Sequence, residues 1–454
     1  MKPGTRVLVL GAGLAGMLSA YELRKAGYHV QVLEFQNRSG GRNISLRGGD
    51  TVTELGGATQ KVGFAPGNYI NPGPWRIPYH HQGLLHYCRE FGVALEPFIE
   101  LNHNTWLHSS EAFGGRPVRY RELSADFNGF TAELLAKAID QHRLDDAVSA
   151  EEREYLRTAM QEWGRLDAGL SYGKGALSSG MRGYDRAPGG DRTARPPSRR
   201  PSRARMSCAR GCGHGWPFTS GWTCRQPCSS PWGHGHDRQG FNRQVHDLIT
   251  LNCKVTAIHQ DDRGVRVTYN DMGHGGVVRE AQADYCVCTI PLPVLSQLDV
   301  QVGAALRAAI MAVPYVSSVK MGLEFRRRFW EEDEQIYGGI SFTDQQINQI
   351  SYPSNGFSPA GRGAAGGYMF GPAAYDFAGM TPAERLEHAL AQGRCFIPSS
   401  IARSFPTASV LPGAGCRGAW AAVRCGMNRP ARPITRPCVP WITGSYWRVS
   451  MHPM

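Results

Sequence analysis

The chain lacks long hydrophobic runs. No apolar stretch among its 454 residues reaches the roughly 18 residues that a membrane-spanning helix needs. The first apolar run begins already at Val7, which leaves no room for a signal peptide after Met1. We therefore expect a soluble, cytoplasmic chain with no membrane partner, and a secretion signal upstream of Met1 stays the open alternative.

Two segments lack lysine and glutamate. Residues 187–238 hold nine Arg and two Asp, while residues 395–454 hold seven Arg and no acidic residue. Each segment contributes +7 to the formal net charge of +12, so the remainder of the chain is slightly acidic. Because the excess positive charge is confined to segments of abnormal composition, it does not indicate a nucleic-acid surface, and we expect no nucleic-acid partner.

The start of the chain shows a strand, a glycine turn, a helix and a second strand. Val7–Leu10 and Val30–Leu33 are apolar runs of strand length, and a helical pattern between them extends to Ala26. Glu34 follows the second strand, where a carboxylate accepts hydrogen bonds from both hydroxyls of an adenosine ribose. This order predicts a Rossmann-type dinucleotide site, and the acidic residue argues against a 2′-phosphate.

The turn before the predicted helix carries three glycines. Gly11 allows the tight turn, Gly13 lets backbone N–H groups approach a pyrophosphate, and Gly16 lets the helix pack closely on the strand. The helix N-terminus adds partial positive charge at the phosphates. A glycine turn alone is a weak signal and a purely structural turn is the alternative, but the register of all the parts favours the nucleotide site.

Two further segments narrow the identification. Ser39-Gly40-Gly41-Arg42 follows the second strand, and Glu54-Leu55-Gly56-Gly57-Ala58 comes next. With them the chain resembles the flavin-containing amine oxidase family. The resemblance implies an α/β fold that combines a Rossmann-type FAD-binding domain with a mixed-sheet substrate domain and a helical subdomain. It implies FAD as cofactor, contacted by Gly11, Gly13, Ala15, Gly16, Glu34, Gly41, Arg42, Gly56, Gly57, Ala58, Gly73, Pro74, Arg76 and the backbone at Val255.

One segment points to the substrate. Asn71-Pro72-Gly73-Pro74-Trp75-Arg76-Ile77-Pro78 precedes a helical pattern over Gln82–Phe91. It resembles the L-amino-acid oxidase branch, where the Arg of GPxRIP binds the α-carboxylate of the substrate. A guanidinium suits this task because its planar fork matches a carboxylate. Relatives that oxidise simple amines need no such cation, so Arg76 favours an amino acid; a surface arginine before a proline turn is the alternative.

Two strand patterns carry further candidates. The run from Ser317 to Phe325 resembles the family strand whose lysine, here Lys320, holds a water near flavin N5. The run from Gly367 to Gly371 resembles the strand whose tyrosine, here Tyr368, gives the carboxylate a second hydrogen bond. Lys320 as a solvated edge residue and Tyr368 as simple core packing are the alternatives.

The chain is long enough for two or three domains. Ser149 and Glu152 form a capping-box pattern before a helix through Trp163, and Phe130–His142 shows a second helical pattern. Further patterns predict a helix over Phe241–Leu251 and strands over Lys254–Ile258, Val265–Tyr269 and Tyr285–Ile290. We predict an FAD-binding domain (1–62 plus 239–300), a substrate domain (63–128 plus 301–394), a helical subdomain (129–186) and aberrant segments at 187–238 and 395–454.

The first aberrant segment allows two explanations. Cys208, Cys212, Cys224 and Cys228, with His214, His234 and His236 nearby, come close to zinc-ribbon spacing. A shifted reading frame in GC-rich DNA also yields Arg, Pro, Gly, Ser and Cys with few Lys or Glu. We favour the shifted frame and expect no stoichiometric metal, with a disordered or lineage-specific insertion as a further alternative.

The genetic code supports the shifted frame. Shifted codons of residues 226–233 and 232–239 permit TMFQPVG and GGMDMIGK, which together resemble the FQPVGGMD segment of the family. Shifted codons of residues 446–453 permit LAGEHAS, which resembles its last FAD-binding motif, and the same shift from Cys395 permits LHPQQYRTEFPHGVSVAW. The chain with these segments restored is called the frame-restored chain below.

The sequence therefore predicts an FAD-dependent oxidase that converts an L-amino acid, O2 and water to a 2-oxo acid, ammonia and hydrogen peroxide. Lys320 is the catalytic candidate, and Arg76 and Tyr368 are the candidates for substrate binding. The alternatives are a flavin monoamine oxidase acting on an amine and an inactive remnant from a damaged gene. The sequence does not decide whether the protein forms a homo-oligomer.

Overall fold

The computed structural model describes residues 4–53, 59–143, 148–173, 175–189, 193–201, 228–229, 234–356, 361–396, 407–411 and 422–423. None of the described helices is long and apolar enough to cross a membrane. The helices are α1 (Leu14–Lys25), α2 (Gln82–Glu90), α3 (Tyr120–Asp140), α4 (Ala150–Gly164), α5 (Ala176–Arg182), α7 (His234–Val245), α8 (Leu292–Leu295), α9 (Ala304–Ala312), α10 (Phe329–Glu332), α11 (Pro372–Gly379) and α12 (Pro382–Gly393), with short 3-10 turns at His246–Leu248 and Met272–His274.

The strands form several sheets, two of which position the site. The longer ones are β1 (Arg6–Leu10), β2 (His29–Leu33), β12 (Cys253–Asp261), β13 (Gly264–Asp271), β14 (Val277–Ala283), β15 (Tyr285–Cys288), β18 (Ser318–Phe325), β19 (Ile340–Thr343), β21 (Gly363–Phe370) and β22 (Thr407–Leu411). The shorter ones are β3 (Leu46–Arg47), β4 (Thr51–Thr53), β5 (Thr59–Lys61), β6 (Tyr69–Ile70), β7 (Glu96–Pro97), β8 (Trp106–His108), β9 (Val118–Arg119), β10 (Cys228–Ser229), β11 (Ile249–Thr250), β16 (Asp299–Val300), β17 (Tyr315–Val316), β20 (Gln349–Ser351) and β23 (Ala422–Val423).

The first of these sheets is the predicted βαβ unit. Its four strands run in the order β11-β2-β1-β15, and every pairing is parallel. Helix α1 connects β1 to β2 and buries Gly16, Met17 and Ala20 against the sheet. Both strands and the helix lie within a residue or two of the predicted ranges, so this part of the Rossmann-type prediction is confirmed.

The helix predicted over Phe241–Leu251 was wrong at both ends. Helix α7 starts at His234 and stops at Val245, and Ile249–Thr250 is a strand beside β2. The apolar positions fit a helix as well as a short buried strand, so periodicity could not separate them. Tertiary pairing decides, because the N–H of Glu34 donates to the carbonyl of Thr250 over 2.9 Å.

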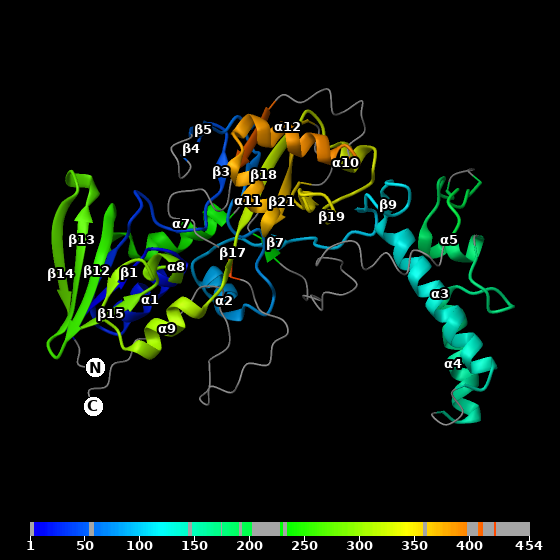
Figure 1. The fold of residues 1–454 in the computed structure, drawn as a ribbon, viewed down its shortest axis with the longest axis horizontal. Coiled ribbons are helices and arrows are strands. Elements are labelled where there is room, and N and C mark those ends of the chain that lie inside the picture. Colours follow the sequence, from blue (N-terminus) through cyan, green and yellow to red (C-terminus); the bar gives the residue numbers. More distant parts are fainter. Residues whose placement is uncertain are drawn as a thin grey trace.

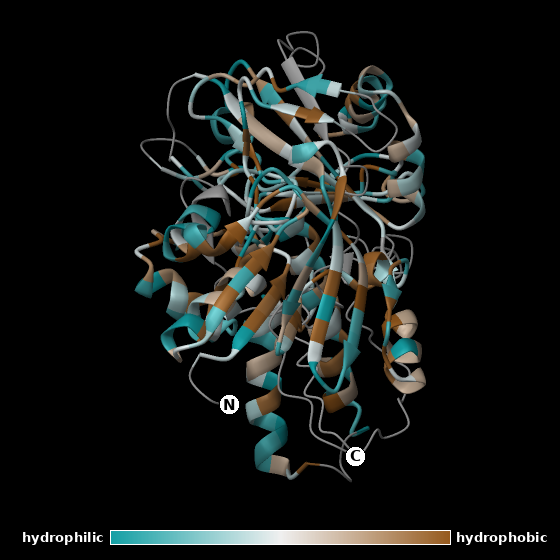
Figure 2. Cartoon of the chain, turned by 90° about the vertical axis from the view of Figure 1, so that its left-hand side faces the viewer, coloured by the Kyte–Doolittle hydropathy of each residue, from teal (hydrophilic) through white to brown (hydrophobic). Residues whose placement is uncertain are grey.

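A separate sheet of four strands, in the order β14-β13-β12-β16, lies at the left of Figure 1. Strands β12 and β13 cover the strands predicted over Lys254–Ile258 and Val265–Tyr269 and pair antiparallel, after which β15 returns to the parallel sheet. Along β12 and β13 hydrophobic residues alternate with hydrophilic ones (Figure 2). This alternation of period two marks a sheet with one face packed on a core.

The larger mixed sheet has the order β22-β18-β21-β20-β19-β8-β9 and lies in the centre of Figure 1. Side chains of β18 alternate between its two faces. Val319, Met321 and Leu323 pack into a cluster with Trp330, Phe377 and Ala389, which come from α10, α11 and α12. Lys320 and Glu324 therefore point to the opposite face, where Lys320 contacts Gly73 and Glu324 contacts Ala65 and Asn68.

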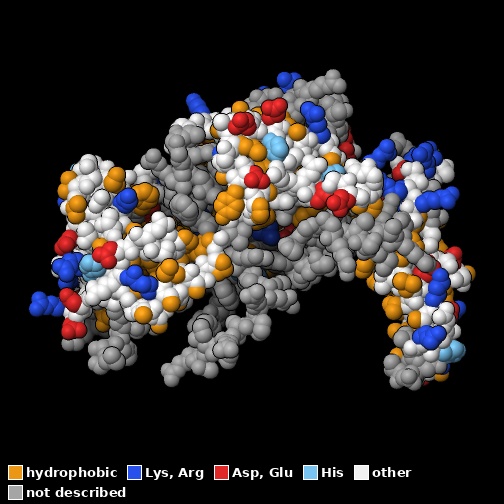
Figure 3. Space-filling model, viewed as in Figure 1, with side chains coloured by type: hydrophobic (Ala, Val, Ile, Leu, Met, Phe, Trp, Pro, Cys, Tyr) orange, Lys and Arg blue, Asp and Glu red, His pale blue; other side chains and the backbone are white. Residues whose placement is uncertain are grey.

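Helices α3, α4 and α5 form an arm that projects from the body at the right of Figure 1. The capping box at Ser149 is confirmed, with the N–H of Ser149 donating to Glu152 over 2.7 Å. Helix α3, however, begins at Tyr120 and not near Phe130, because Glu122, Leu123 and Asp126 already pack inward. Figure 3 shows hydrophobic and basic side chains exposed together on this arm.

The structure describes only parts of the two aberrant segments. Strand β10 pairs with β7, β22 pairs with β18, and β23 pairs with β17. Cys208, Cys212 and Cys224 lie outside the described residues, as do the positions of the LAGEHAS motif. The zinc hypothesis, the shifted frame and the division into domains therefore stay predictions.

The arm contains a buried ion cluster that provides a stability test. The Arg182 side chain is fully buried and lies 2.8 Å from Glu122 and 2.7 Å from Asp126. We expect Arg182→Met to destabilise the protein by about 3–5 kcal/mol, because it removes the cation that compensates the charge of two buried carboxylates. Denaturant unfolding measures the change.

The matched control is Arg157→Met on the same arm. Arg157 lies 3.2 Å from Asp140, but both side chains are at least 40% exposed, so solvent screens the pair and little change is expected. Equal effects of the two substitutions would contradict the buried cluster.

Candidate active site

The glycine turn after β1 is built as the dinucleotide motif requires. Gly11 has φ +98°, and a Cβ there would lie 2.7 Å from Thr289 Oγ1. A Cβ on Gly16 would lie 1.9 Å from the carbonyl oxygen of Gly11, so only glycine lets the helix approach this closely. Gly13 differs, because a Cβ there would meet nothing within 4 Å. The turn is therefore tight inside and open at Gly13.

The open side faces the N-terminus of α1. Gly13 is its N-cap and provides no side-chain hydrogen bond, and the first helical bond runs from the N–H of Met17 to the carbonyl of Gly13. The N–H groups of Leu14, Ala15 and Gly16 consequently have no acceptor within the helix. Together with the helix dipole they form a place for a diphosphate.

Glu34 lies at the end of β2, directly beside this turn. Its side chain is buried, and it accepts hydrogen bonds from the N–H groups of Ala12 (2.6 Å) and Gln36 (2.8 Å). Burial raises the pKa of the Glu34 carboxyl, and those two backbone hydrogen bonds oppose the rise. Val255 is 8% exposed on β12, which begins where the N–H of Cys253 donates to the Glu34 carbonyl over 2.7 Å.

Two other glycine segments converge on the turn. The N–H of Gly40 donates to the carbonyl of Ala12 over 2.7 Å, and a Cβ on Gly41 would lie 3.4 Å from Gly13. A Cβ on Gly73 would lie 1.9 Å from the Arg42 carbonyl oxygen. Gly41, Arg42 and Gly73 are therefore brought together, with the exposed Pro74 adjoining them, whereas Gly56, Gly57 and Ala58 lie outside the described residues.

Lys320 occupies the middle of β18, opposite Tyr368 on β21. It is 3% exposed, its Nζ donates to the carbonyl of Gly73, and Nζ lies 4.4 Å from the Trp75 ring centroid and 4.5 Å from that of Tyr368. Burial holds the pKa of Lys320 well below its usual range, and the charge of Arg76 lowers it further. The alternative of a solvated edge lysine is therefore wrong.

Tyr368 is half-buried among aromatic rings. Its ring centroid lies 5.0 Å from that of Trp75 and 3.9 Å from that of Phe370. Burial raises the pKa of the Tyr368 hydroxyl, and a hydrogen bond with Ser318 and the charge of Arg76 oppose this rise. Arg76 is thus close enough to act electrostatically on both Lys320 and Tyr368.

Arg76 has a partner that the sequence did not suggest. Its Nη2 lies 2.7 Å from Oε1 of Glu100, and each side chain is 26% exposed. Glu100 lies 24 positions further along the chain, in the loop between β7 and β8. No local pattern marks it, because the pairing depends on how that loop folds back over Arg76.

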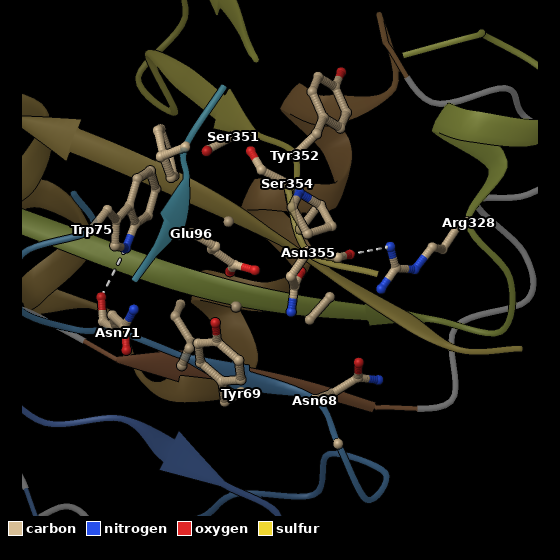
Figure 4. A pocket seen from close by; sticks show the side chains of 18 residues that line it. Asn68, Tyr69, Asn71, Trp75, Glu96, Arg328, Ser351, Tyr352, Ser354 and Asn355 are labelled. Atoms are coloured by element: carbon tan, nitrogen blue, oxygen red, sulfur yellow. Dashed lines mark hydrogen bonds between the residues drawn. The ribbon is translucent and has the colours of Figure 1, made fainter. Parts of the chain in front are cut away.

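A pocket of about 100 Å³ continues along the same sheet face (Figure 4). Trp75 stands at one end, where its indole N–H donates to the carbonyl of Asn71 over 2.8 Å, and Arg328 stands at the other. Gly322 and Gly366 form its floor, two positions from Lys320 and Tyr368. Sequence reasoning missed this pocket, which is also lined by Asn68, Tyr69, Glu96, Phe98, Ser351, Tyr352, Ser354 and Asn355.

The residues present fit a bound flavin dinucleotide. The open space at Gly13, the helix N–H groups and the acceptor at Glu34 suit the diphosphate and ribose, while Lys320 lies on the adjoining sheet. Fold and site together define an α/β flavoprotein oxidoreductase. The chain matches the flavin containing amine oxidoreductases over residues 14–423, which is most of its length. The protein belongs to this family, and its cofactor is FAD.

Individual relatives agree with this family. An L-amino-acid oxidase of Bothrops pauloensis is 26% identical over 381 residues, covering 80% of this chain and 68% of the relative. BjussuLAAO-I, an L-amino-acid oxidase of Bothrops jararacussu, is 26% identical over 382 residues, covering 81% and 69%. Among solved structures, putrescine oxidase bound to putrescine superposes with a TM-score of 0.55 at 16% identity, covering 92% of this chain and 87% of that chain. The last likeness shows the shared fold.

The open space at Gly13 generates a test of the FAD site. A methyl group there would enter that space without meeting protein atoms, and its φ of −69° suits alanine. We expect Gly13→Ala to leave the melting temperature of the apoprotein unchanged and to weaken FAD binding about tenfold or more, by obstructing the phosphates. Flavin fluorescence titration measures the affinity.

Gly379→Ala is the matched control. A Cβ at Gly379 in α11 also meets nothing within 4 Å, but it lies outside the glycine cradle. FAD affinity unchanged in Gly13→Ala, or reduced equally in both variants, would contradict the assignment.

Proposed function

We propose that the protein oxidises an L-amino acid with O2 and water to a 2-oxo acid, ammonia and hydrogen peroxide. The observation that carries the proposal is the position of Arg76, a cation close to both Lys320 and Tyr368. The L-amino-acid oxidases among its relatives support it. A cytoplasmic location and assembly with further copies stay predictions.

Each residue has a task in this proposal. Arg76 binds the substrate α-carboxylate through guanidinium N–H groups, and the Tyr368 hydroxyl gives that carboxylate a second hydrogen bond. Lys320, whose pKa is lowered by burial, holds a water at Nζ near the flavin. Trp75, Tyr368 and Phe370 exclude bulk water from this place. FAD bound in the glycine cradle would supply the redox chemistry, as acceptor of a hydride from the substrate α-carbon and donor of electrons to O2. Water would then hydrolyse the resulting imino acid to the 2-oxo acid and ammonia.

One observation favours a second candidate, the oxidation of an amine that has no carboxylate. Glu100 already neutralises Arg76, as a site for an uncharged group would require. The likeness of fold to putrescine oxidase is compatible with both candidates. Paired substrates that differ only in the carboxylate distinguish them.

The frame question is tested by flavin content. We expect the 454-residue chain to purify with clearly less than one FAD per chain, because residues 446–454 do not carry the GEHAS motif. Each hydrogen bond lost to the cofactor would cost about 0.5–1.5 kcal/mol. The frame-restored chain should purify yellow and fully loaded, as flavin absorbance relative to protein will show.

A fully loaded, peroxide-producing preparation of the 454-residue chain would contradict the shifted frame. So would one zinc per chain whose removal unfolds the protein, because that result would support a metal site at Cys208, Cys212, Cys224 and Cys228.

Arg76 is tested on the frame-restored chain with L-leucine and 3-methylbutylamine, which differ only in the carboxylate. We expect Arg76→Ala to lower kcat/KM for L-leucine about a hundredfold, because the carboxylate loses its partner, and to spare any rate with the amine. Arg76→Lys, which keeps the charge without the fork, should be intermediate. Peroxide release measures all rates.

An equal loss on both substrates would remove the carboxylate-binding role of Arg76. A higher rate with the amine than with L-leucine in the unsubstituted enzyme would favour the second candidate.

A further inference from the structure

The ion pair between Arg76 and Glu100 is not explained by folding. Nη2 of Arg76 and Oε1 of Glu100 are 2.7 Å apart, yet a quarter of each side chain is exposed. Ion pairs this accessible to water add little to stability, because solvent screens them and side-chain entropy opposes them. The pair lies beside the residues proposed to bind substrate, which points to a role in binding.

The backbone that carries Glu100 is held from both sides. The N–H of Ile99 donates to Ser354 Oγ over 3.0 Å, and the Ile99 carbonyl accepts from the N–H of Gly339 over 2.8 Å. The side-chain amide of Asn102 donates to the carbonyl of Tyr337 over 2.9 Å. Glu100 therefore projects from a loop whose position is set one residue before it and two residues after it.

A pair of glycines makes this close approach of the loop possible. Gly338 and Gly339 have φ of +64° and +85°. A Cβ on Gly338 would lie 2.7 Å from Ile99 Cβ, and one on Gly339 would lie 2.5 Å from Asn102 Cβ. Neither position accepts a larger residue without moving the loop, so the carboxylate of Glu100 is delivered to one place.

The backbone at Arg76 is equally fixed, but its side chain is long. Trp75 is tied to Asn71 through its indole N–H, and Ile77 is buried in the core with Val9 and Met17. The Arg76 side chain itself has several rotatable bonds, and ordering it on ligand binding would reduce affinity. A fixed carboxylate at Nη2 removes that freedom beforehand.

The closest contact of Glu100 with the guanidinium group of Arg76 is the one to Nη2. Among the described residues, no other ion pair or hydrogen bond holds the Arg76 side chain. A guanidinium has five N–H donors, so donors stay available for a second carboxylate. The contact thus orients the group without occupying it.

We propose that Glu100 is a positioning residue, which orients Arg76 for the α-carboxylate of an amino acid and so favours amino acids over amines. The proposal rests on the proposed function, in which Arg76 binds that carboxylate. In this proposal the negatively charged Glu100 serves to orient Arg76 and does not mark a site for amines.

The experiment uses the frame-restored chain loaded with FAD and two probes. These are 3-phenylpropanoate, which has a carboxylate and no amine, and 2-phenylethylamine, which has an amine and no carboxylate. Calorimetry measures each affinity for the unsubstituted chain and for Glu100→Gln, Glu100→Ala and Arg76→Ala. Asp140→Ala, which breaks another exposed ion pair on the arm, is the control.

The comparison of Glu100→Gln with Glu100→Ala isolates orientation, because both remove the charge and only glutamine keeps an acceptor for Nη2. We expect Glu100→Ala to bind 3-phenylpropanoate about tenfold more weakly than Glu100→Gln. Binding of 2-phenylethylamine should change less than about twofold, and all melting temperatures should stay close to that of the control.

The outcomes separate the two levels of the argument. The positioning role would be overturned if Glu100→Ala bound 3-phenylpropanoate as tightly as Glu100→Gln, or more tightly. It would also be overturned if Glu100→Ala lost affinity equally for both probes. If Arg76→Ala still binds the carboxylate, or if the unsubstituted chain does not, the proposed function fails together with this inference. If Arg76→Ala no longer binds 3-phenylpropanoate while Glu100→Ala binds it as well as Glu100→Gln does, only the inference fails.

Discussion

The hydrogen bond from Lys320 Nζ to the carbonyl of Gly73 connects the two halves of the site. Gly73 also packs without a side chain against the carbonyl of Arg42, which adjoins the dinucleotide turn. One backbone segment therefore touches both the cofactor cradle and the mixed sheet. Because Trp75 and Arg76 follow Gly73 directly, this contact also sets where the proposed substrate-binding side chain begins.

Burial of a lysine is costly, and the structure shows how the cost is limited. Lys320 has a carbonyl acceptor, and the faces of Trp75 and Tyr368 lie within cation–π distance. Desolvation nevertheless favours the neutral amine, and the nearby Arg76 adds to this effect.

Charge around Arg76 is balanced in an unusual way for a carboxylate site. The positive charge that should attract a substrate already has a negative neighbour in Glu100. Orientation and neutralisation are consequences of the same contact, and they have opposite effects on the affinity for a carboxylate. In the proposed positioning role the orienting effect dominates, so Glu100, a residue outside the recognised motifs, would favour amino acids over amines.

The sequence by itself determined the cofactor class and the βαβ unit, because glycine turns, an acidic strand end and strand-helix-strand periodicity are local properties. It also picked out Arg76, Lys320 and Tyr368, although their meeting requires β18 and β21 to pair in one register. Only the tertiary structure decided that Lys320 is buried, that the chain after Val245 leaves the helix for a strand, and that Glu100 reaches Arg76. Each of these depends on contacts between segments far apart in the chain, which no local pattern encodes.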